Sequence, residues 1–437
     1  MSREFCTDRD PSPSLIPRVV VVAALALAFA PSTQDWPQVL GPSRDGIYAG
    51  PPLADNWGAK GPRVVWRKTV GHGLSGPVVV GGRVILFQRV GNREVVEAMS
   101  TGTGATEWRH DYPTTYRDDF GFDDGPRAVP VVAGDAVYTY GAEGQLHAVN
   151  ATNGQPLWHV DAMRKYQVPK NFFGAGGSPV VDGNRVIANV GGPDAGIVAF
   201  DAKTGRELWT ATRDGASYSS GVMTAVNGQR VALFLTRAGI VGVAPATGAI
   251  VLQHAWRSRS ASSVNAASPL VVGDRLFVSA EYGPGAGVFR MDGGTLPFDS
   301  GSGHPEQGRG VTELWSSNDV LSNHYATSVH RDGILYGYHG RQELGPSLRA
   351  VELATGKVRW TVDGFRAGSI TLAGNKLILM RESGELVMAD ATPERFRSLA
   401  SAQVLPATVR ALTAIAGGFL YVRNDDTLVC LDLRGPR

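Results

Sequence analysis

The chain repeats one short pattern eight times. Each copy begins at a small or polar residue and continues with an apolar run, a tight turn that contains glycine, and a second apolar run. Runs rich in β-branched residues on both sides of a glycine turn are typical of antiparallel hairpins. The copies span residues 76–87, 128–140, 178–190, 222–235, 268–280, 326–338, 369–380 and 412–422. Such a spacing predicts a repeat architecture, with one supersecondary unit in each copy.

A second motif follows most of the hairpins. A short apolar strand leads into Thr-Gly or Asn-Gly, and a tryptophan stands four residues after the glycine. Each unit therefore has four antiparallel strands, and radial packing of such units produces a β-propeller. We expect the repeat tryptophans to pack on the glycine turn of the next blade. They are Trp66, Trp108, Trp158, Trp209, Trp315 and Trp360. The last such turn, near Pro393, has lost the motif.

The strands at the two ends of the repeat region complete the count of blades. The segment 427–433 ends the last repeat without a fourth strand, and the segment 64–70 precedes the first repeat as an unpaired strand. Joining the two forms an eighth blade and leaves no open sheet edge. The sequence thus predicts an all-β fold, an eight-bladed β-propeller over residues 64–437, preceded by an N-terminal extension at 31–63.

Residues 1–30 have the pattern of a secretory signal peptide. The apolar run at 19–30 follows Arg18, is too short to span a bilayer as a helix, and ends in Ala28-Phe29-Ala30, a small-x-small cleavage pattern. A buried strand or a misassigned start codon is the alternative. We therefore expect a bacterial protein that is periplasmic or secreted and has no transmembrane segment in its mature chain.

Charge and cysteine content exclude several classes of protein. The formal net charge is 42 − 40 = +2, so a nucleic-acid partner is not expected. The two cysteines are Cys6 and Cys430, too few for a disulfide framework, a zinc cluster or a haem-attachment motif.

The segment AFDAKTGRELW at 199–209 resembles the tryptophan motif of quinoprotein-type propellers, the pyrroloquinoline-quinone-like (PQQ-like) repeat family. The segment DWPQVLGPSRDG at 35–46 is similar to the leader of many secreted members, and the resemblance covers roughly residues 35–433. The family includes quinone-dependent alcohol and glucose dehydrogenases and non-catalytic BamB-like scaffolds. This chain lacks the vicinal cysteine pair of the alcohol dehydrogenases and a lipidated cysteine after the apolar run.

The fold predicts where a binding site would lie. In a propeller, the links from one blade's outer strand to the next blade's inner strand share a face with the links between the second and third strands. That face surrounds the central funnel, where ligands usually bind. The candidate ligand-binding residues on these links are Asp118, Asp119, Lys170, Asn171, Tyr218, Arg257, Arg259, Asn265, Asn323, His324, Tyr325, His339, Arg341 and Glu343. The sequence assigns no catalytic residue.

The sixth blade carries the densest group of these residues. His324 and His339 stand on different links, which we expect to converge beside Arg341 and Glu343. Two imidazoles and a carboxylate could bind a metal ion or shuttle protons, and a guanidinium could bind an anion. The same residues could instead form a polar network that fixes long loops.

Three functions fit these observations. The first is an exported scaffold that recognises an unknown protein or small-molecule ligand through the funnel face. The second, implied by the resemblance, is an oxidoreductase that uses PQQ and calcium and acts on an alcohol or a sugar. The third and weakest is a metal-assisted hydrolase or lyase that uses the histidine pair. The residues considered for PQQ are Lys170, Trp256, Arg257, Arg259 and Arg341.

Overall fold

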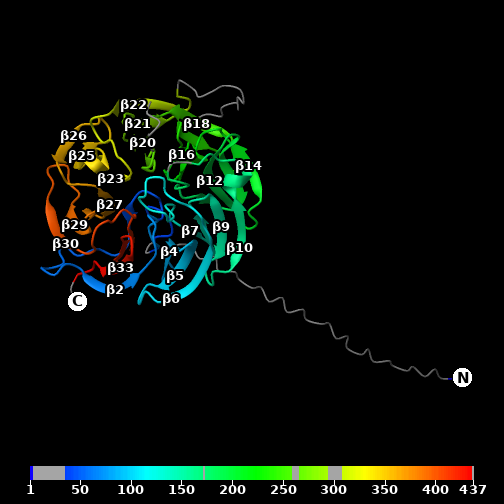
Figure 1. The fold of residues 1–437 in the computed structure, drawn as a ribbon. Coiled ribbons are helices and arrows are strands. Elements are labelled where there is room, and N and C mark those ends of the chain that lie inside the picture. The colour runs from blue at the N-terminus through cyan, green and yellow to red at the C-terminus, as the bar shows by residue number, and fades with distance from the viewer. Residues whose placement is uncertain (3–34, 171–172, 258–264, 294–307, 436–437) are drawn as a thin grey trace.

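The protein forms a closed ring of eight blades (Figure 1), each a four-stranded antiparallel sheet. The structure is a computed structural model that describes residues 1–2, 35–170, 173–257, 265–293 and 308–435. The predicted eight-bladed, all-β propeller is confirmed. The apolar run of the predicted signal peptide, Asn171 and Arg259 lie outside the described residues. None of the described helices is long and apolar enough to cross a membrane.

The first four blades follow one another along the chain from the innermost strand outward. Blade 1 contains β3 (Val78–Val80), β4 (Arg83–Val90), β5 (Arg93–Ser100) and β6 (Thr106–Pro113). Blade 2 contains β7 (Val131–Ala133), β8 (Ala136–Tyr140), β9 (Gln145–Asn150) and β10 (Pro156–Asp161), followed by the short helix α1 (Ala162–Lys165). Blade 3 contains β11 (Val180–Asp182), β12 (Arg185–Gly192), β13 (Ala195–Asp201) and β14 (Glu207–Ala211). Blade 4 contains β15 (Val222–Val226), β16 (Gln229–Leu235), β17 (Gly239–Val243) and β18 (Ile250–Ala255).

The remaining blades include the two that take strands from the N-terminal part. Blade 5 contains β19 (Leu270–Val272), β20 (Arg275–Ala280), β21 (Gly285–Met291) and β22 (Val311–Ser317). Blade 6 contains β23 (Val329–Arg331), β24 (Ile334–His339), the 3-10 helix η1 (Gln342–Leu344), β25 (Ser347–Glu352) and β26 (Val358–Val362). Blade 7 contains β27 (Gly368–Ala373), β28 (Lys376–Arg381), β29 (Glu385–Asp390) and β30 (Ser398–Gln403), with β1 (Ile47–Tyr48) beside β27. Blade 8 contains β31 (Ala414–Ala416), β32 (Phe419–Arg423), β33 (Thr427–Asp432) and β2 (Arg63–Thr69).

The place of a strand within its blade determines its burial. The second and third strands lie between neighbouring blades, so both of their faces are covered and they read as nearly continuous apolar runs. All five residues of β8 and of β17 are buried, whereas the outer strand β10 has none that is. Tight turns join the inner strands. Gly134, with φ of 60°, supplies the left-handed conformation that the turn between β7 and β8 requires.

The eighth blade is built from segments far apart in the sequence. β2 pairs antiparallel with β33, and the register runs from Arg63 opposite Asp432 to Thr69 opposite Thr427. The Arg63 guanidinium donates a hydrogen bond to the Asp432 carboxylate at 2.8 Å. In Figure 1, β2 (blue) lies beside β33 (red). The predicted closure of the ring by the N- and C-terminal strands is therefore confirmed.

Six tryptophans on the outermost strands contact the following blade. Each indole Nε1 donates a hydrogen bond of 2.8–3.2 Å to a backbone carbonyl in the turn between the next blade's third and fourth strands. For Trp108 the acceptor is Ala151, and the indole lies against the glycine of the same turn. A Cβ atom at Gly154 would come within 2.5 Å of that ring.

The N-terminal residues 35–48, here called the axial segment, lie inside the ring. Trp36 exchanges two backbone hydrogen bonds with Val79 in β3, and the Pro37 carbonyl accepts the amide of Val132 in β7. β1, at the end of the segment, pairs in parallel with β27. The segment therefore contacts the innermost strands of blades 1, 2 and 7. The sequence patterns gave no indication of this placement.

Arg44 fixes the middle of the axial segment to the other side of the ring. Its side chain is 3% exposed. Its guanidinium donates to the backbone carbonyls of Pro179 and Gly221, which immediately precede the inner strands of blades 3 and 4, and to the Gln38 side chain. The axial segment therefore crosses the centre of the propeller, from blades 1, 2 and 7 to blades 3 and 4.

The contact between Trp108 and Gly154 can be tested by a matched pair of substitutions. Gly154→Ala and Gly134→Ala both place a methyl group on a backbone with positive φ, which costs about 1 kcal/mol or more. Only Gly154→Ala drives that methyl group into an indole ring, because nothing lies within 4 Å of a Cβ at Gly134. We expect Gly154→Ala to lower the free energy of unfolding by a further ~1–3 kcal/mol, measured by denaturant titration. Equal losses in the two variants would contradict the contact.

Candidate functional site

The funnel face is the rim formed by the links that lead from each outer strand to the next inner strand. In the described part of the chain it includes residues 70–77, 114–130, 162–170, 173–179, 212–221, 256–257, 265–269, 318–328, 363–367 and 404–413. The second-to-third-strand links lie on the same rim by strand alternation. All the described candidate residues therefore belong to one face of the ring.

A repeated hydrogen bond joins these links at their base. The residue two positions before an inner strand donates its amide to the hydroxyl of the equivalent residue in the next blade. Val129 donates to Ser178 at 2.9 Å and Ser178 donates to Ser220 at 3.0 Å, while Ser268 donates to Thr327 at 2.9 Å. These hydrogen bonds therefore hold the ends of the longer funnel-face loops in fixed positions.

The loop at 114–130 is organised around one buried carboxylate. Asp118 accepts the backbone amides of Phe120, Phe122 and Asp123 at 2.9–3.2 Å. It also accepts a charge-assisted hydrogen bond from Arg127 at 2.9 Å. Asp118 was predicted as a ligand-binding residue, and in the structure its oxygens bind the loop itself.

This loop presents two exposed phenylalanines. Phe120 is 56% exposed and Phe122 is 58% exposed. Their rings lie 6.3 Å apart, and Phe173 lies 5.4 Å and 6.2 Å from them. Phe173 in turn contacts the ring of Tyr218 at 5.5 Å. We call Phe120, Phe122, Phe173 and Tyr218 the aromatic patch.

Cations surround the aromatic patch. The Arg410 guanidinium lies 5.4 Å from the centre of the Phe122 ring, and the Arg127 guanidinium lies 5.4 Å from that of Phe173. Lys170 forms an ion pair with Asp119. The patch joins the links that follow blades 1, 2 and 3, and Arg410 adds the link that follows blade 7. Sequence reasoning selected Tyr218, Lys170 and Asp119 but missed the phenylalanines, although the string FGF between two acidic pairs marks them.

A cavity of about 490 Å³ lies beside the patch, next to blade 2. Its lining includes Tyr116, Arg117, Glu143, Arg164 and Lys170. Glu143 accepts hydrogen bonds from the hydroxyls of Thr114 and Thr115, and these bonds help to lower the pKa of the carboxyl group against the effect of its burial. The cavity thus combines three cations with two carboxylates, those of Glu143 and Asp161.

The sixth-blade residues form a packed cluster. His324 Nδ1 accepts the amide of Gln342 at 3.2 Å, and its Nε2 lies 3.3 Å from the hydroxyl of Tyr282. The Arg341 guanidinium stacks on the Tyr282 ring at 4.5 Å. Glu343 lies 3.9 Å from both His324 and Arg341. The adjoining cavity measures about 10 Å³, room for about one water molecule.

His339 has a separate environment. Its Nδ1 accepts the amide of Ser322 at 3.1 Å, and no contact joins it to His324 in the described part of the chain. Among the described residues, no group of three or more His, Cys, Asp or Glu side chains is arranged to hold a metal ion. The geometry therefore resembles the predicted loop-fixing network more than a metal centre.

The remaining candidates contribute hydrogen bonds between links. Tyr325 donates to Glu382 at 2.8 Å, and Glu382 also contacts Arg410 at 3.1 Å. The amide groups of Asn265 and Asn323 are buried and donate to Thr236 O and Ser328 Oγ, while their Oδ1 atoms have no hydrogen-bond partner. Tyr282, Glu382 and Arg410 were not selected from the sequence.

The residues considered for PQQ are dispersed. Trp256 is buried in blade 4 and meets Phe289 edge-on at 5.4 Å. Arg257 is exposed. Lys170 lies between blades 2 and 3, on the opposite side of the ring from Arg341 in blade 6. Within the described residues, these groups do not surround one space that would fit a flat tricarboxylate.

Protonation of His339 should link stability to pH. Burial, together with the charge of Arg349, lowers the pKa of His339 to about 4, against ~6.5 in an unfolded chain. As the pH falls from about 6.5 to about 4, the unfolded chain takes up this proton before the native protein does, so stability decreases. We expect the melting temperature of His339→Gln to fall less steeply than that of the wild type over this window. The exposed His159→Gln serves as the control, and parallel curves for His339→Gln and the wild type would contradict the assignment.

Comparison with known proteins gives two kinds of relative. The chain is 34% identical over 140 residues to the quinohemoprotein alcohol dehydrogenase ADH-IIG of Pseudomonas putida, which covers 30% of this chain and 18% of that protein. It is 27% identical over 196 residues to the outer membrane protein assembly factor BamB of Burkholderia pseudomallei (strain K96243), covering 44% of this chain and 45% of the relative. The chain thus spans less than half of the length of either curated relative.

Structural comparison supports the fold alone. The quinohemoprotein alcohol dehydrogenase of Comamonas testosteroni superposes with a TM-score of 0.62 and 16% identity, over 92% of this chain and 81% of that one. The family model described as outer membrane protein assembly factor BamB matches residues 92–362, which is more than half of the chain. The chain therefore belongs to the BamB family of PQQ-like β-propellers.

Proposed function

We propose that this protein is an exported binding scaffold whose funnel face receives a segment of a partner protein at the aromatic patch. The observation that carries the proposal is the exposure of Phe120 and Phe122 on a loop that Asp118 holds in one conformation. Large aromatic side chains that are exposed and fixed are typical of interaction sites, because they bury much area at little entropic cost.

The surroundings of the patch indicate the chemistry of the partner. Arg127 and Arg410 lie against its rings, and Arg117, Arg164 and Lys170 line the adjacent cavity. Four of these five cations already form ion pairs with carboxylates of the protein, so an apolar side chain of the partner would be the complementary group. Because the axial segment crosses the centre of the ring, the partner would bind on the rim and not thread through it.

Export is part of the proposal and rests on the apolar run at 19–30. The family match to an outer membrane assembly factor supports a place in the cell envelope.

Capture experiments with matched variants test the proposal. Three forms of the protein would each be cross-linked in an envelope extract of the source organism. They are the wild type, the double variant Phe120→Ser/Phe122→Ser and the control Leu157→Ser. Leu157 is 47% exposed on the outer strand β10 and lies away from the funnel face. We expect one partner band that the double variant reduces about tenfold or more and that Leu157→Ser leaves unchanged. Equal capture by all three proteins would contradict the proposal.

The oxidoreductase function is favoured by the likeness to the alcohol dehydrogenase of Pseudomonas putida. The described residues do not bring the expected cations and a ring face together, so no catalytic step is derived from PQQ. Titration with PQQ and Ca²⁺, followed by tryptophan fluorescence, separates the two functions. The scaffold proposal predicts no saturable quenching at cofactor excess, whereas tight stoichiometric quenching would favour the dehydrogenase.

A further inference from the structure

One turn on the rim opposite the funnel face differs from its equivalents. The link between β29 and β30 spans residues 391–397, two residues longer than the equivalent links 101–105 and 353–357. It contains Pro393 and no glycine. The hydrogen bond that closes the turn is kept, from the Asp390 amide to the Arg397 carbonyl at 3.0 Å. The two extra residues therefore bulge out between blades 6 and 7.

The bulge is anchored to the neighbouring blade. Trp360 donates its indole N–H to the Thr392 carbonyl at 2.8 Å. Phe396 packs edge-on against the Trp360 ring at 5.8 Å and against Phe365 at 5.6 Å. These contacts bury the apolar side of the turn and leave its charged side chains facing outward.

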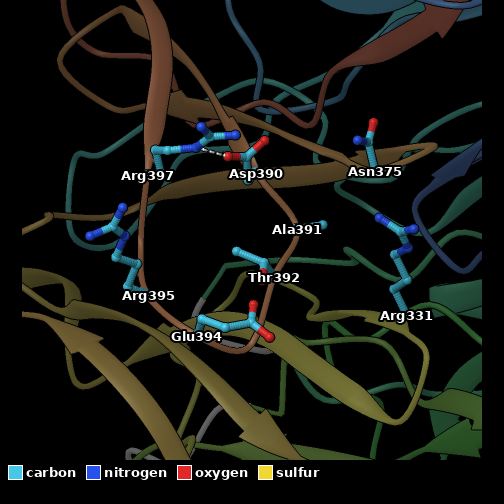
Figure 2. A pocket seen from close by; sticks show the side chains of 8 residues that line it. All are labelled: Arg331, Asn375, Asp390, Ala391, Thr392, Glu394, Arg395 and Arg397. Atoms are coloured by element: carbon cyan, nitrogen blue, oxygen red, sulfur yellow. Dashed lines mark hydrogen bonds and ion pairs between the residues drawn. The ribbon is translucent and has the colours of Figure 1, made fainter.

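The bulge and the neighbouring turns line an open surface pocket of about 430 Å³ (Figure 2). In this view Arg331, from the end of β23 in blade 6, and Asn375 lie on one side of the pocket. Arg395 and Arg397 lie on the other side. Glu394 lies between the two sides. A volume of this size is within the range of small-molecule sites.

The three guanidinium groups of the pocket differ in how many hydrogen bonds and ion pairs they form with the protein. Arg397 forms an ion pair with Asp390. Arg331 contacts the adjacent Asp332 at 3.1 Å through its Nε alone. Arg395 makes no hydrogen bond or ion pair with any described residue, and neither does the Glu394 carboxylate. The pocket therefore offers N–H donors from two arginines, together with one free carboxylate.

We propose that this pocket binds a small polyhydroxylated oxyanion, a sugar acid or a sugar phosphate. A planar guanidinium matches the oxygens of a carboxylate or phosphate, so Arg395 and Arg331 would hold the anionic group. Glu394 and the Asn375 amide supply the acceptors and donors that sugar hydroxyls require. This site lies on the opposite rim from the aromatic patch and is independent of the proposed scaffold function.

Calorimetric titration of the full chain tests the pocket. The probes are glucuronate, glucose 6-phosphate, glucose and inorganic phosphate. We expect saturable binding of one of the two charged sugars and none of glucose. Comparison of the two charged sugars identifies the anionic group. Failure of both to bind, or binding of glucose or inorganic phosphate as tightly as the charged sugar, would overturn the proposal.

Substitutions distinguish specific binding in the pocket from a general effect of positive surface charge on affinity. Arg395→Ala and Arg331→Ala should each weaken binding about tenfold or more, since each removes charge-assisted hydrogen bonds to the anionic group. Arg206 is an exposed arginine that closes the equivalent turn of blade 3. Arg206→Ala should leave the affinity unchanged, as should Phe120→Ser/Phe122→Ser. Equal weakening by Arg206→Ala would show a nonspecific charge effect and contradict the site.

Discussion

The pairing of β2 with β33 is the constraint on which the rest of the structure depends. Without it, blade 8 would have three strands and the sheet would expose an unpaired edge, a template for aggregation. With it, every blade packs between two neighbours and strand alternation sorts the links onto two rims. The ion pair between Arg63 and Asp432 fastens β2 to β33 within blade 8. The bond from Trp66 to the Thr101 carbonyl fastens it to blade 1, and the bond from Arg67 to the Val404 carbonyl fastens it to the link that follows blade 7.

The two rims have different physical characters. The funnel-face links are long, and their bases are joined by amide-to-hydroxyl hydrogen bonds such as that from Ser178 to Ser220. On the opposite rim, the turns between third and fourth strands are short, and in five of them a glycine lies against a tryptophan ring, which leaves no room for a side chain there. The turn at 391–397 departs from this rule because it has no glycine, and a pocket forms there. One pocket thus lies where the repeat motif is interrupted, and the other lies beside the long links that follow blades 1 and 2.

Much of the fold could be predicted because its signals are local. A glycine turn between two β-branched runs specifies a hairpin within about a dozen residues, and counting strands at both ends predicted the closure. The axial segment could not be predicted this way. Its partners, Val79, Val132 and Leu372, are up to more than 300 residues away in the sequence. The burial of Arg44 also runs against the usual exposure of arginine.

The sequence predicted which face of the ring carries the candidate site, but it did not predict how the side chains on that face are arranged. Topology alone determined which links share the funnel face. It could not determine that Asp118 turns inward to bind its own loop, or that His324 and His339 accept different backbone amides. Those outcomes depend on side-chain direction and on packing between blades. The exposure of Phe120 and Phe122 could not be predicted because phenylalanine side chains are usually buried.

Cysteine cross-linking across the closing strands tests the closed ring most directly. In a chain with Cys6 and Cys430 replaced by alanine, Thr69→Cys would stand opposite Thr427→Cys, a register pair whose Cβ atoms are expected ~4.5–5.5 Å apart. The closed ring predicts a disulfide in the folded protein and none for Lys68→Cys with Thr427→Cys, since Lys68 points to the other face of the sheet. Absence of the first cross-link, or equal yields of both, would contradict a propeller closed by its two ends.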